Sequence, residues 1–154
     1  MSTNQLNEKA VKFQSFLAEN KLNYFGSEIR NDELKSVLFR TELPVNGNNL
    51  PLLLLTDDSI YTMIKILVVP KGVTAENREA LATKINAYNV QYKIFKYTLT
   101  EDNDIVLDIS VPALAEHFDE KLIMSLIDIA LKHLTEEYAD LMRIVWSKSE
   151  TVKN

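Results

Sequence analysis

The sequence predicts an α+β fold in which an antiparallel sheet of about five strands packs with three helices. Apolar residues recur at helical spacing in separate stretches, and segments between them alternate apolar and polar side chains as strands do. Turn-forming residues separate the segments. The predicted order is one helix, three strands, one helix, two strands and a long closing helix. We expect one domain over residues 1–147 and a polar tail over residues 148–154.

Composition and charge narrow the classes of function. The chain has a net charge of −5 and no basic stripe, which disfavours nucleic-acid binding because phosphate neutralisation needs clustered Lys and Arg. It has no cysteine for a disulfide or a reactive thiol. The N-terminus lacks an apolar signal core, and the apolar runs are far too short to span a bilayer. We expect a cytoplasmic protein with neither a nucleic-acid nor a membrane partner.

The first helix is predicted over residues 4–20, where apolar side chains form one stripe. Ser2, Thr3 or Asn4 could cap its start by accepting backbone N–H bonds. The opposite side is expected to face solvent. The stripe comprises Leu6, Ala10, Phe13, Phe16 and Leu17, and the solvated side comprises Glu8, Lys9, Lys12 and Glu19.

The segments that follow predict strands in series. Residues 23–31 are ambiguous between a strand and a packed loop, whereas residues 36–43 alternate clearly. In the second segment Val37, Phe39 and Thr41 share a face. Pro44, with the turn-forming residues after it, is expected to end that strand.

Two further strands, at residues 52–55 and 60–69, are apolar on both faces. A leucine-sized side chain left in water forgoes roughly 1.5–3 kcal/mol, so both faces need a cover. One interpretation is that the chain's own helices suffice. The other is that one face forms a dimer or partner interface, for which aromatic and Met side chains are typical. The opposite face carries Ile64 and Ile66, and the predicted interface residues are Leu53, Leu55, Tyr61, Met63 and Leu67.

A helix at residues 74–88, a hairpin and a long helix complete the prediction. Thr74 is a suitable cap for the first of these helices. The hairpin strands are expected over residues 92–100 and 105–111, joined by an acidic turn in which Asn and Asp tolerate a left-handed backbone. Asp119 is expected to cap the long helix, and Thr135 marks a candidate break within it.

The two histidines are the first candidates for chemistry. His117 lies among acidic residues and could act as a metal ligand or a general base, but an ordinary surface histidine is the favoured interpretation. His133 has the spacing to share a helix face with Glu136 or Glu137 as two metal ligands. No third ligand is evident for either histidine. We therefore expect His133 to lie on a solvated, charged face.

Acidic residues are the second candidates. Asp57 and Asp58 could act as paired carboxylates, and the run Asp102-Asn103-Asp104 superficially resembles a calcium loop. Tight turns favour these residues for local hydrogen bonding alone. The three glycines are too dispersed for a phosphate-binding loop, and no Ser lies in a nucleophile elbow. We expect no enzyme, no metal and no cofactor.

The second half of the chain resembles a known family. The relevant residues are Ile85 to Asn89, Tyr92 to Phe95, Thr100 to Ile105 and the pair Phe118-Asp119. In these segments the chain resembles the YbjN-like family. The family pattern has an Asn-containing helix end, a hairpin with an acidic turn and a closing helix, and the resemblance extends over residues 36–146. Members are often labelled sensory-transduction regulators. The resemblance implies a fold similar to that of type III secretion chaperones, which is usually dimeric, binds other proteins and performs no catalysis.

The leading hypothesis is therefore a non-enzymatic protein-binding module, chaperone-like or regulatory, that acts as a homodimer. The alternative is a small-molecule-sensing domain with a pocket between helix and sheet, lined by Tyr24, Phe39, Tyr92 and Phe95. A third hypothesis is a hydrolytic or metal-dependent enzyme that uses His117 and its acidic neighbours.

Overall fold

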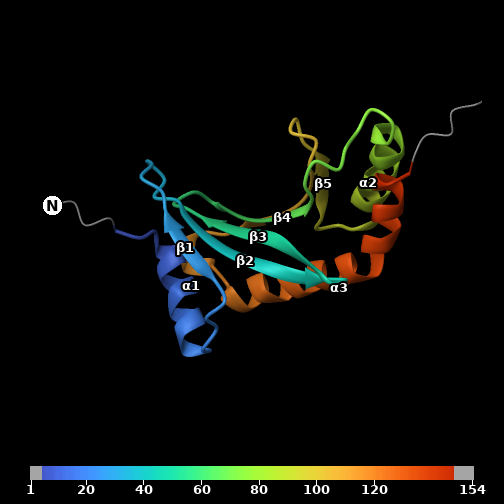
Figure 1. Cartoon of the computed structure of the whole chain (residues 1–154). Helices are drawn as coiled ribbons and strands as arrows, with labels where there is room; N and C mark the ends of the chain where they lie inside the picture. Colours follow the sequence, from blue (N-terminus) through green and yellow to red (C-terminus); the bar gives the residue numbers. More distant parts are fainter. Residues whose placement is uncertain (1–4, 148–154) are drawn as a thin grey trace, which may run out of the picture.

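The computed structural model describes residues 5–147 and confirms the α+β class, with three α-helices and one antiparallel sheet (Figure 1). The predicted tail at residues 148–154 lies outside the described part. The elements in chain order are α1 (Glu8–Glu19), β1 (Gly26–Ile29), β2 (Val37–Val45), β3 (Asn48–Thr56), β4 (Tyr61–Val69), α2 (Arg78–Gln91), β5 (Lys96–Leu99), β6 (Ile105–Pro112), a short 3₁₀ helix (Ala115–His117) and α3 (Glu120–Val145).

The sheet has six strands in the order β1-β2-β3-β4-β6-β5, and every neighbouring pair is antiparallel. The prediction of about five strands is wrong by one. The additional strand is β1, which arises from the ambiguous segment 23–31. All four residues of β1 are exposed, so this strand has no buried face and its sequence lacks the alternation by which strands are recognised.

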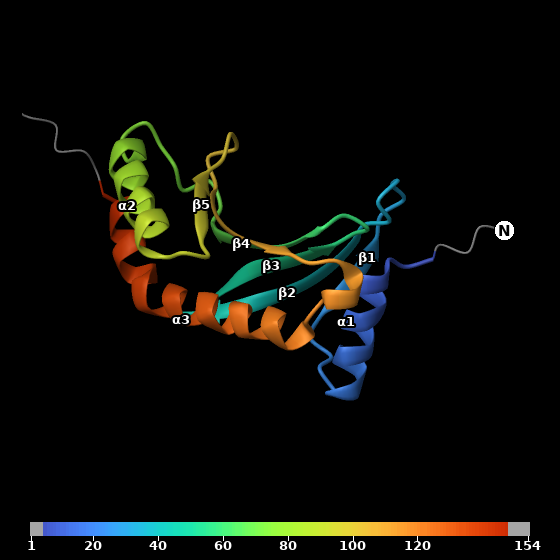
Figure 2. The same ribbon diagram turned by 180° about the vertical axis from the view of Figure 1, so that it is seen from behind.

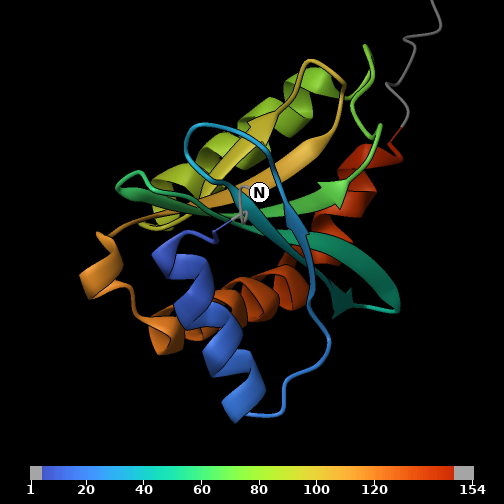
Figure 3. The same ribbon diagram turned by 90° about the vertical axis from the view of Figure 1, so that its left-hand side faces the viewer.

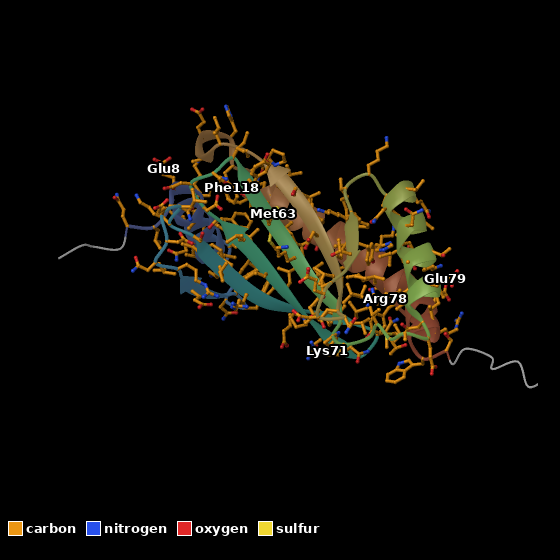
Figure 4. The ribbon with its side chains drawn as sticks, turned by 90° about the horizontal axis from the view of Figure 1, so that it is seen from above. Glu8, Met63, Lys71, Arg78, Glu79 and Phe118 are labelled. Atoms are coloured by element: carbon orange, nitrogen blue, oxygen red, sulfur yellow. The ribbon has the colours of Figure 1, made fainter. Side chains whose placement is uncertain are left out.

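The helices are distributed unequally over the two faces of the sheet. α1 and α3 lie against one face, and α2 stands beside β5 at one end (Figures 1 and 2). We call the face under α1 and α3 the covered face. No helix of the described residues lies over the opposite side, the open face, which is turned toward the viewer in Figure 4 with Met63 on it.

One continuous core fills the covered face. In β4 the predicted face is confirmed, because Ile64 and Ile66 are both fully buried. At the α1 end, the Phe13 ring packs edge-on against Phe39, with their centroids 4.8 Å apart, and against Phe25 at 5.4 Å. These contacts dock α1 onto the sheet through large apolar surfaces, which dominate the energetics of such cores.

α3 runs beneath the sheet from α1 toward α2 (Figure 1). Asp119 caps it as predicted, accepting a hydrogen bond from the Leu122 backbone N–H at 3.0 Å. The candidate break at Thr135 is wrong, because the helix continues through it and the Thr135 hydroxyl donates back to the Leu131 carbonyl at 2.8 Å. Within residues 5–147, no helix combines the length and apolarity needed to cross a membrane.

Pro44 does not end its strand, contrary to the prediction. β2 continues to Val45 and turns into β3 through Asn46 and Gly47, both with positive φ, as a two-residue hairpin requires. β1 pairs with β2 only as far as Arg40. By the alternation of an antiparallel ladder, the Pro44 nitrogen faces this vacated side, where no ladder hydrogen bond is lost.

The start of α1 also differs from its prediction. Asn7 is the cap, and its side chain accepts from the Ala10 N–H at 2.8 Å, while Ser2, Thr3 and Asn4 lie outside the described residues. Lys9 was expected on a solvated surface but is 2% exposed. Its ammonium donates to the Ser59 carbonyl at 2.7 Å and the Tyr61 carbonyl at 3.2 Å, which joins α1 to the β3–β4 turn.

The segment around α2 is shifted along the chain relative to its prediction. Thr74 and Asn77 exchange reciprocal side-chain to backbone hydrogen bonds, and the α-helix begins after them. Asn77 also donates to the Val145 carbonyl at 3.0 Å, tying α2 to the end of α3. Residues 92–95 are not a strand as predicted, because the helix extends to Gln91 and pairing with β6 starts at Lys96.

Candidate functional site

The five predicted interface residues all lie on the open face of the sheet. Leu55 stands directly across from Met63, and Leu53 stands across from Lys65. The side chains of Leu53, Leu55, Met63 and Leu67 are half-buried. Tyr61, at the start of β4, is 55% exposed. We call these five residues the open-face patch.

One neighbouring strand extends the apolar surface. Val106 of β6 lies across from Leu67 and is half-buried, whereas Leu38 of β2, across from Leu55, is only 6% exposed. A hollow of about 640 Å³ opens beside the patch, lined by residues of β2, β3, β4, β5 and β6 and by Thr100. Its lining combines the apolar side chains Leu53, Leu67 and Val106 with the polar residues Arg40, Glu42, Lys65, Thr98 and Asp108.

Charged side chains cross the open face in one row. Lys65 of β4 forms an ion pair with Asp108 of β6, with Nζ 3.2 Å from Oδ2. Arg40 of β2 pairs with Glu28 of β1 at 3.1 Å. Leu53 lies between Arg40 and Lys65 in the same row. Each of these two cations is thus matched by an acid on the next strand outward, and Leu53 makes the centre of the row apolar.

Sequence reasoning did not select these charged residues as part of the site. The sequence nevertheless contained a signal, since Lys65 and Asp108 are the only charged residues in two strands that are mostly apolar. Asp108 is only 9% exposed, and its Oδ1 atom has no hydrogen-bond partner among the described residues. A buried carboxylate oxygen without a donor is costly, so this position is an unusual one in the sheet.

The open face carries amine, guanidinium, hydroxyl and carboxylate groups. Two of its carboxylates, those of Asp108 and Glu28, are held in ion pairs. A face with a half-exposed apolar centre and a charged row suits an apolar ligand or chain segment whose polar atoms reach the flanking charges.

Among the titratable residues, His133 differs most from its predicted environment. It was predicted to lie on a solvated face, but it is 4% exposed. Its ring packs against four aromatic rings of the α2–β5 region, because α2 and β5 close over this part of α3. The ring centroids lie 4.5 Å away for Tyr92, 4.8 Å for Phe95, 5.1 Å for Tyr88 and 5.7 Å for Tyr97.

The electrostatics of this cluster follow from its burial. The Tyr97 hydroxyl lies 2.7 Å from His133 Nε2, and Nδ1 has no partner within residues 5–147. Burial lowers the pKa of His133, because the charged imidazolium loses its hydration, although Glu137 and Glu136 oppose this shift. Burial likewise raises the pKa of Tyr97. The pKa of Tyr88 is raised by burial and by its 2.8 Å hydrogen bond to Glu137.

The other candidate catalytic or metal-binding residues do not cluster with further reactive side chains among the described residues. The His117 side chain is 77% exposed, and its nearest acid is its own neighbour Glu116 at 3.8 Å. Asp57 accepts from the backbone and the hydroxyl of Ser59, which is the local turn role expected for it. Across residues 5–147, no group of three or more His, Asp or Glu side chains is placed to hold a metal.

The run 102–104 forms the predicted turn between β5 and β6. Asn103 has a φ of 64°, which is the left-handed backbone expected there. The polar groups of the turn are used within the protein, since Asp104 accepts from the Lys71 N–H at 2.7 Å and Asn103 from Arg78 at 2.8 Å. The turn therefore anchors the β4–α2 connection.

Buried Lys9 has a lowered pKa, because burial removes hydration from its ammonium, while Asp57 and Asp58 act in the opposite direction. A hollow of about 420 Å³ lies beside it, also lined by Asp57, Asp58 and Lys35. Because the ammonium already donates to two carbonyls, its position is explained by joining α1 to the sheet.

The four residues expected to line one small-molecule pocket lie in two separate clusters, so that prediction is wrong. Phe39 is 1% exposed in the core beside Phe13. Tyr24 is 52% exposed. Tyr92 and Phe95 surround His133. Apolar side chains at these positions fill the protein interior, and the periodicity of the sequence does not distinguish core from pocket.

Comparison of the chain with family models and with curated proteins gives no match. The resemblance to the YbjN-like family therefore remains a prediction from the sequence. Any assignment of function depends on the open face and its neighbouring elements.

Proposed function

We propose that this chain is a non-enzymatic, cytoplasmic protein-binding module that acts as a homodimer and holds an apolar segment of another polypeptide on its open face. The single observation that carries this proposal is the open-face patch, which stays partly exposed where the covered face is closed by α1 and α3. A binder gains free energy by completing the burial of these side chains.

The arrangement of polar groups supports a polypeptide as the ligand. Peptides present apolar side chains and backbone amides together, and the open face places the Lys65–Asp108 and Arg40–Glu28 pairs beside its apolar centre. Charged groups of this kind contribute orientation and specificity more than affinity. The chaperone-like function implied by the YbjN-like resemblance agrees with this proposal.

A binding assay with defined peptides tests the proposal. Peptides with two or three large apolar residues are selected on an array, and their affinity is measured by fluorescence anisotropy. Leu55→Asp and Met63→Asp should each weaken binding by about tenfold or more, since a charge is placed in the contact. Val11→Asp is the matched control, because Val11 is 49% exposed on α1, away from the open face.

The opposite outcome is equally clear. If Leu55→Asp and Met63→Asp bind the selected peptides as tightly as the unaltered chain does, the open face is not the binding surface. The homodimer is tested separately by sedimentation velocity at micromolar concentration, where a strictly monomeric species contradicts that part of the proposal.

The hollow on the open face favours a second candidate, the binding of a small molecule there. Its volume of about 640 Å³ and its mixed lining are typical of metabolite sites. A thermal-shift screen of metabolites should reveal ligands that raise the unfolding temperature. Lys65→Met should abolish such shifts, and shifts that persist in this variant would place the ligand elsewhere.

A further inference from the structure

The two edge strands of the sheet differ in whether their outer backbone groups have partners. At β5 the Asn89 side chain takes the place of a neighbouring strand. Its Oδ1 accepts from the Tyr97 N–H at 2.7 Å and its Nδ2 donates to the Tyr97 carbonyl at 3.0 Å. A side-chain amide thus satisfies the groups that would otherwise pair with another chain.

At β1 the outer backbone groups have no such cover among the described residues. The Arg30 N–H donates to the Ser36 carbonyl at 2.9 Å, so Arg30 faces β2, and so does Glu28 by the alternation of the ladder. Ser27 and Ile29 therefore direct their N–H and C=O groups outward. All four residues of β1 are exposed, and Figure 3 shows β1 in front, with α1 beside it.

We propose that β1 pairs antiparallel with β1 of a second copy, centred on Ile29, so that two sheets join edge to edge. This inference rests on the homodimer of the proposed function and names its interface. In this register Ile29 lies opposite Ile29 of the second copy, and each donates its N–H to the other's carbonyl. Ser27 lies opposite the second copy's Asn31, at the end of the ladder.

Charge complementarity selects a second copy and fixes this register. Glu28 and Arg30 both direct their side chains to the open face, and each is about half-exposed. The register places Glu28 of each copy directly opposite Arg30 of the other, so the two-fold axis generates two such pairs. A register centred one residue earlier would instead set Glu28 against Glu28, and like charges directly opposite are destabilising.

Exposed apolar side chains flank the same edge. Tyr24 precedes β1 and is 52% exposed, Ile29 within it is 49% exposed, and Leu34 after it is 47% exposed. An antiparallel pair brings Tyr24 of one copy toward the end where the second copy's Leu34 lies. Because the two-fold axis is perpendicular to the sheet, the pairing leaves both open faces uncovered and on the same side.

The first experiment separates backbone pairing from side-chain contact. Ile29→Pro removes an outward N–H that the monomer does not use, and Pro is tolerated at such edge positions. Ile29→Ser is the matched control, because it removes the same apolar side chain and keeps the N–H. In sedimentation velocity, Ile29→Pro should be monomeric at concentrations where Ile29→Ser still forms dimers.

The second experiment exchanges the charges. Glu28→Arg and Arg30→Glu should each be monomeric alone, since each sets like charges opposite one another in both pairs. An equimolar mixture of the two variants should form a heterodimer of intermediate mass in native mass spectrometry, because every opposing pair is then of opposite sign. Failure of the mixture to associate, with both variants folded by circular dichroism, overturns the register.

The outcomes also distinguish this interface from the proposed function. If the unaltered protein is a dimer that Ile29→Pro leaves intact and Leu55→Asp dissociates, the edge interface is overturned and the open face makes the dimer. If the unaltered protein is a monomer, the homodimer and this interface both fall, and peptide binding by the open face stands or falls by its own assay.

Discussion

The two faces of this sheet carry similar apolar residues but bury them to different extents. On the covered face Leu54 and Ile64, directly across from each other, are fully buried. On the open face their neighbours Leu55 and Met63 are paired in the same register but only half-buried. The strands are the same and the side chains are equally apolar. The difference is that α1 and α3 lie over one face only.

This difference separates the side chains that stabilise the fold from those that remain accessible. Apolar side chains beneath the helices are removed from water completely, whereas those on the open face would gain further free energy if they were covered. The Lys65–Asp108 and Arg40–Glu28 ion pairs flank the apolar centre of the open face, so part of this face is polar.

The sharpest test of the comparison uses two adjacent leucines. Leu54→Ala should lower the free energy of unfolding by about 2–5 kcal/mol, because it leaves a cavity in the closed core. Leu55→Ala deletes the same atoms from the half-buried position and should cost markedly less. Urea denaturation of both variants measures the difference, and equal losses would show that the open face is as tightly packed as the covered face.

A second test compares polar burial. Lys9→Met keeps the length of the side chain and removes the ammonium that bonds two carbonyls beneath the β3–β4 turn. Leaving these acceptors without a donor should cost about 1–3 kcal/mol. The measurement is again urea denaturation, with Lys132→Met as the control, because Lys132 is exposed on α3. No loss in Lys9→Met would mean that water replaces the ammonium freely.

A third test uses pH to probe the cluster behind β5. The pKa of His133 is lowered from its ordinary value near 6.5, so below pH 6.5 the unfolded chain binds a proton that the folded chain does not. The free energy of unfolding should be full above pH 6.5 and fall as the pH is lowered through the window beneath it. His133→Gln should abolish this slope, and His117→Gln should preserve it, because the His117 side chain is 77% exposed. A slope that survives in His133→Gln would assign the dependence to other groups.

The smallest effect is expected at Arg40. Its ion pair with Glu28 is exposed, with the two side chains 54% and 44% accessible, so solvent screens much of the interaction. Arg40→Met should change the free energy of unfolding by less than about 1 kcal/mol. A loss as large as that of Lys9→Met would contradict the view that the open face contributes little to stability.

Much of the fold could be predicted because local chemistry and tertiary structure agree. The alternation in β4 identified its buried face, and Asn103 adopts the left-handed backbone predicted for the acidic turn. Asp119 caps α3 as its position before an apolar stripe indicated.

The failures share a physical cause, which is that a residue's surroundings come from distant parts of the chain. Lys9 lies on the polar side of α1, and only the β3–β4 turn makes that position buried. His133 is enclosed by rings from α2 and β5. Pro44 is tolerated because β1 stops at Arg40. None of these contacts is encoded in local periodicity.

For the open face, the sequence indicated which apolar residues share a surface but not which helices would leave them uncovered. The two readings of the apolar strands, covered by the chain's own helices or offered to a partner, differed only in the placement of α1, α2 and α3. The structure places α1 and α3 together on the opposite side (Figure 2).

The position of α3 has a consequence for biosynthesis. The strands of the sheet emerge from the ribosome after α1 and before α3, and they can begin to pair while α1 alone lies on the covered face. During that interval both faces of the nascent sheet expose apolar side chains. Molecular chaperones of the cell would therefore encounter this chain when it exposes the most apolar surface. Synthesis of α3 then buries the apolar side chains of one face only.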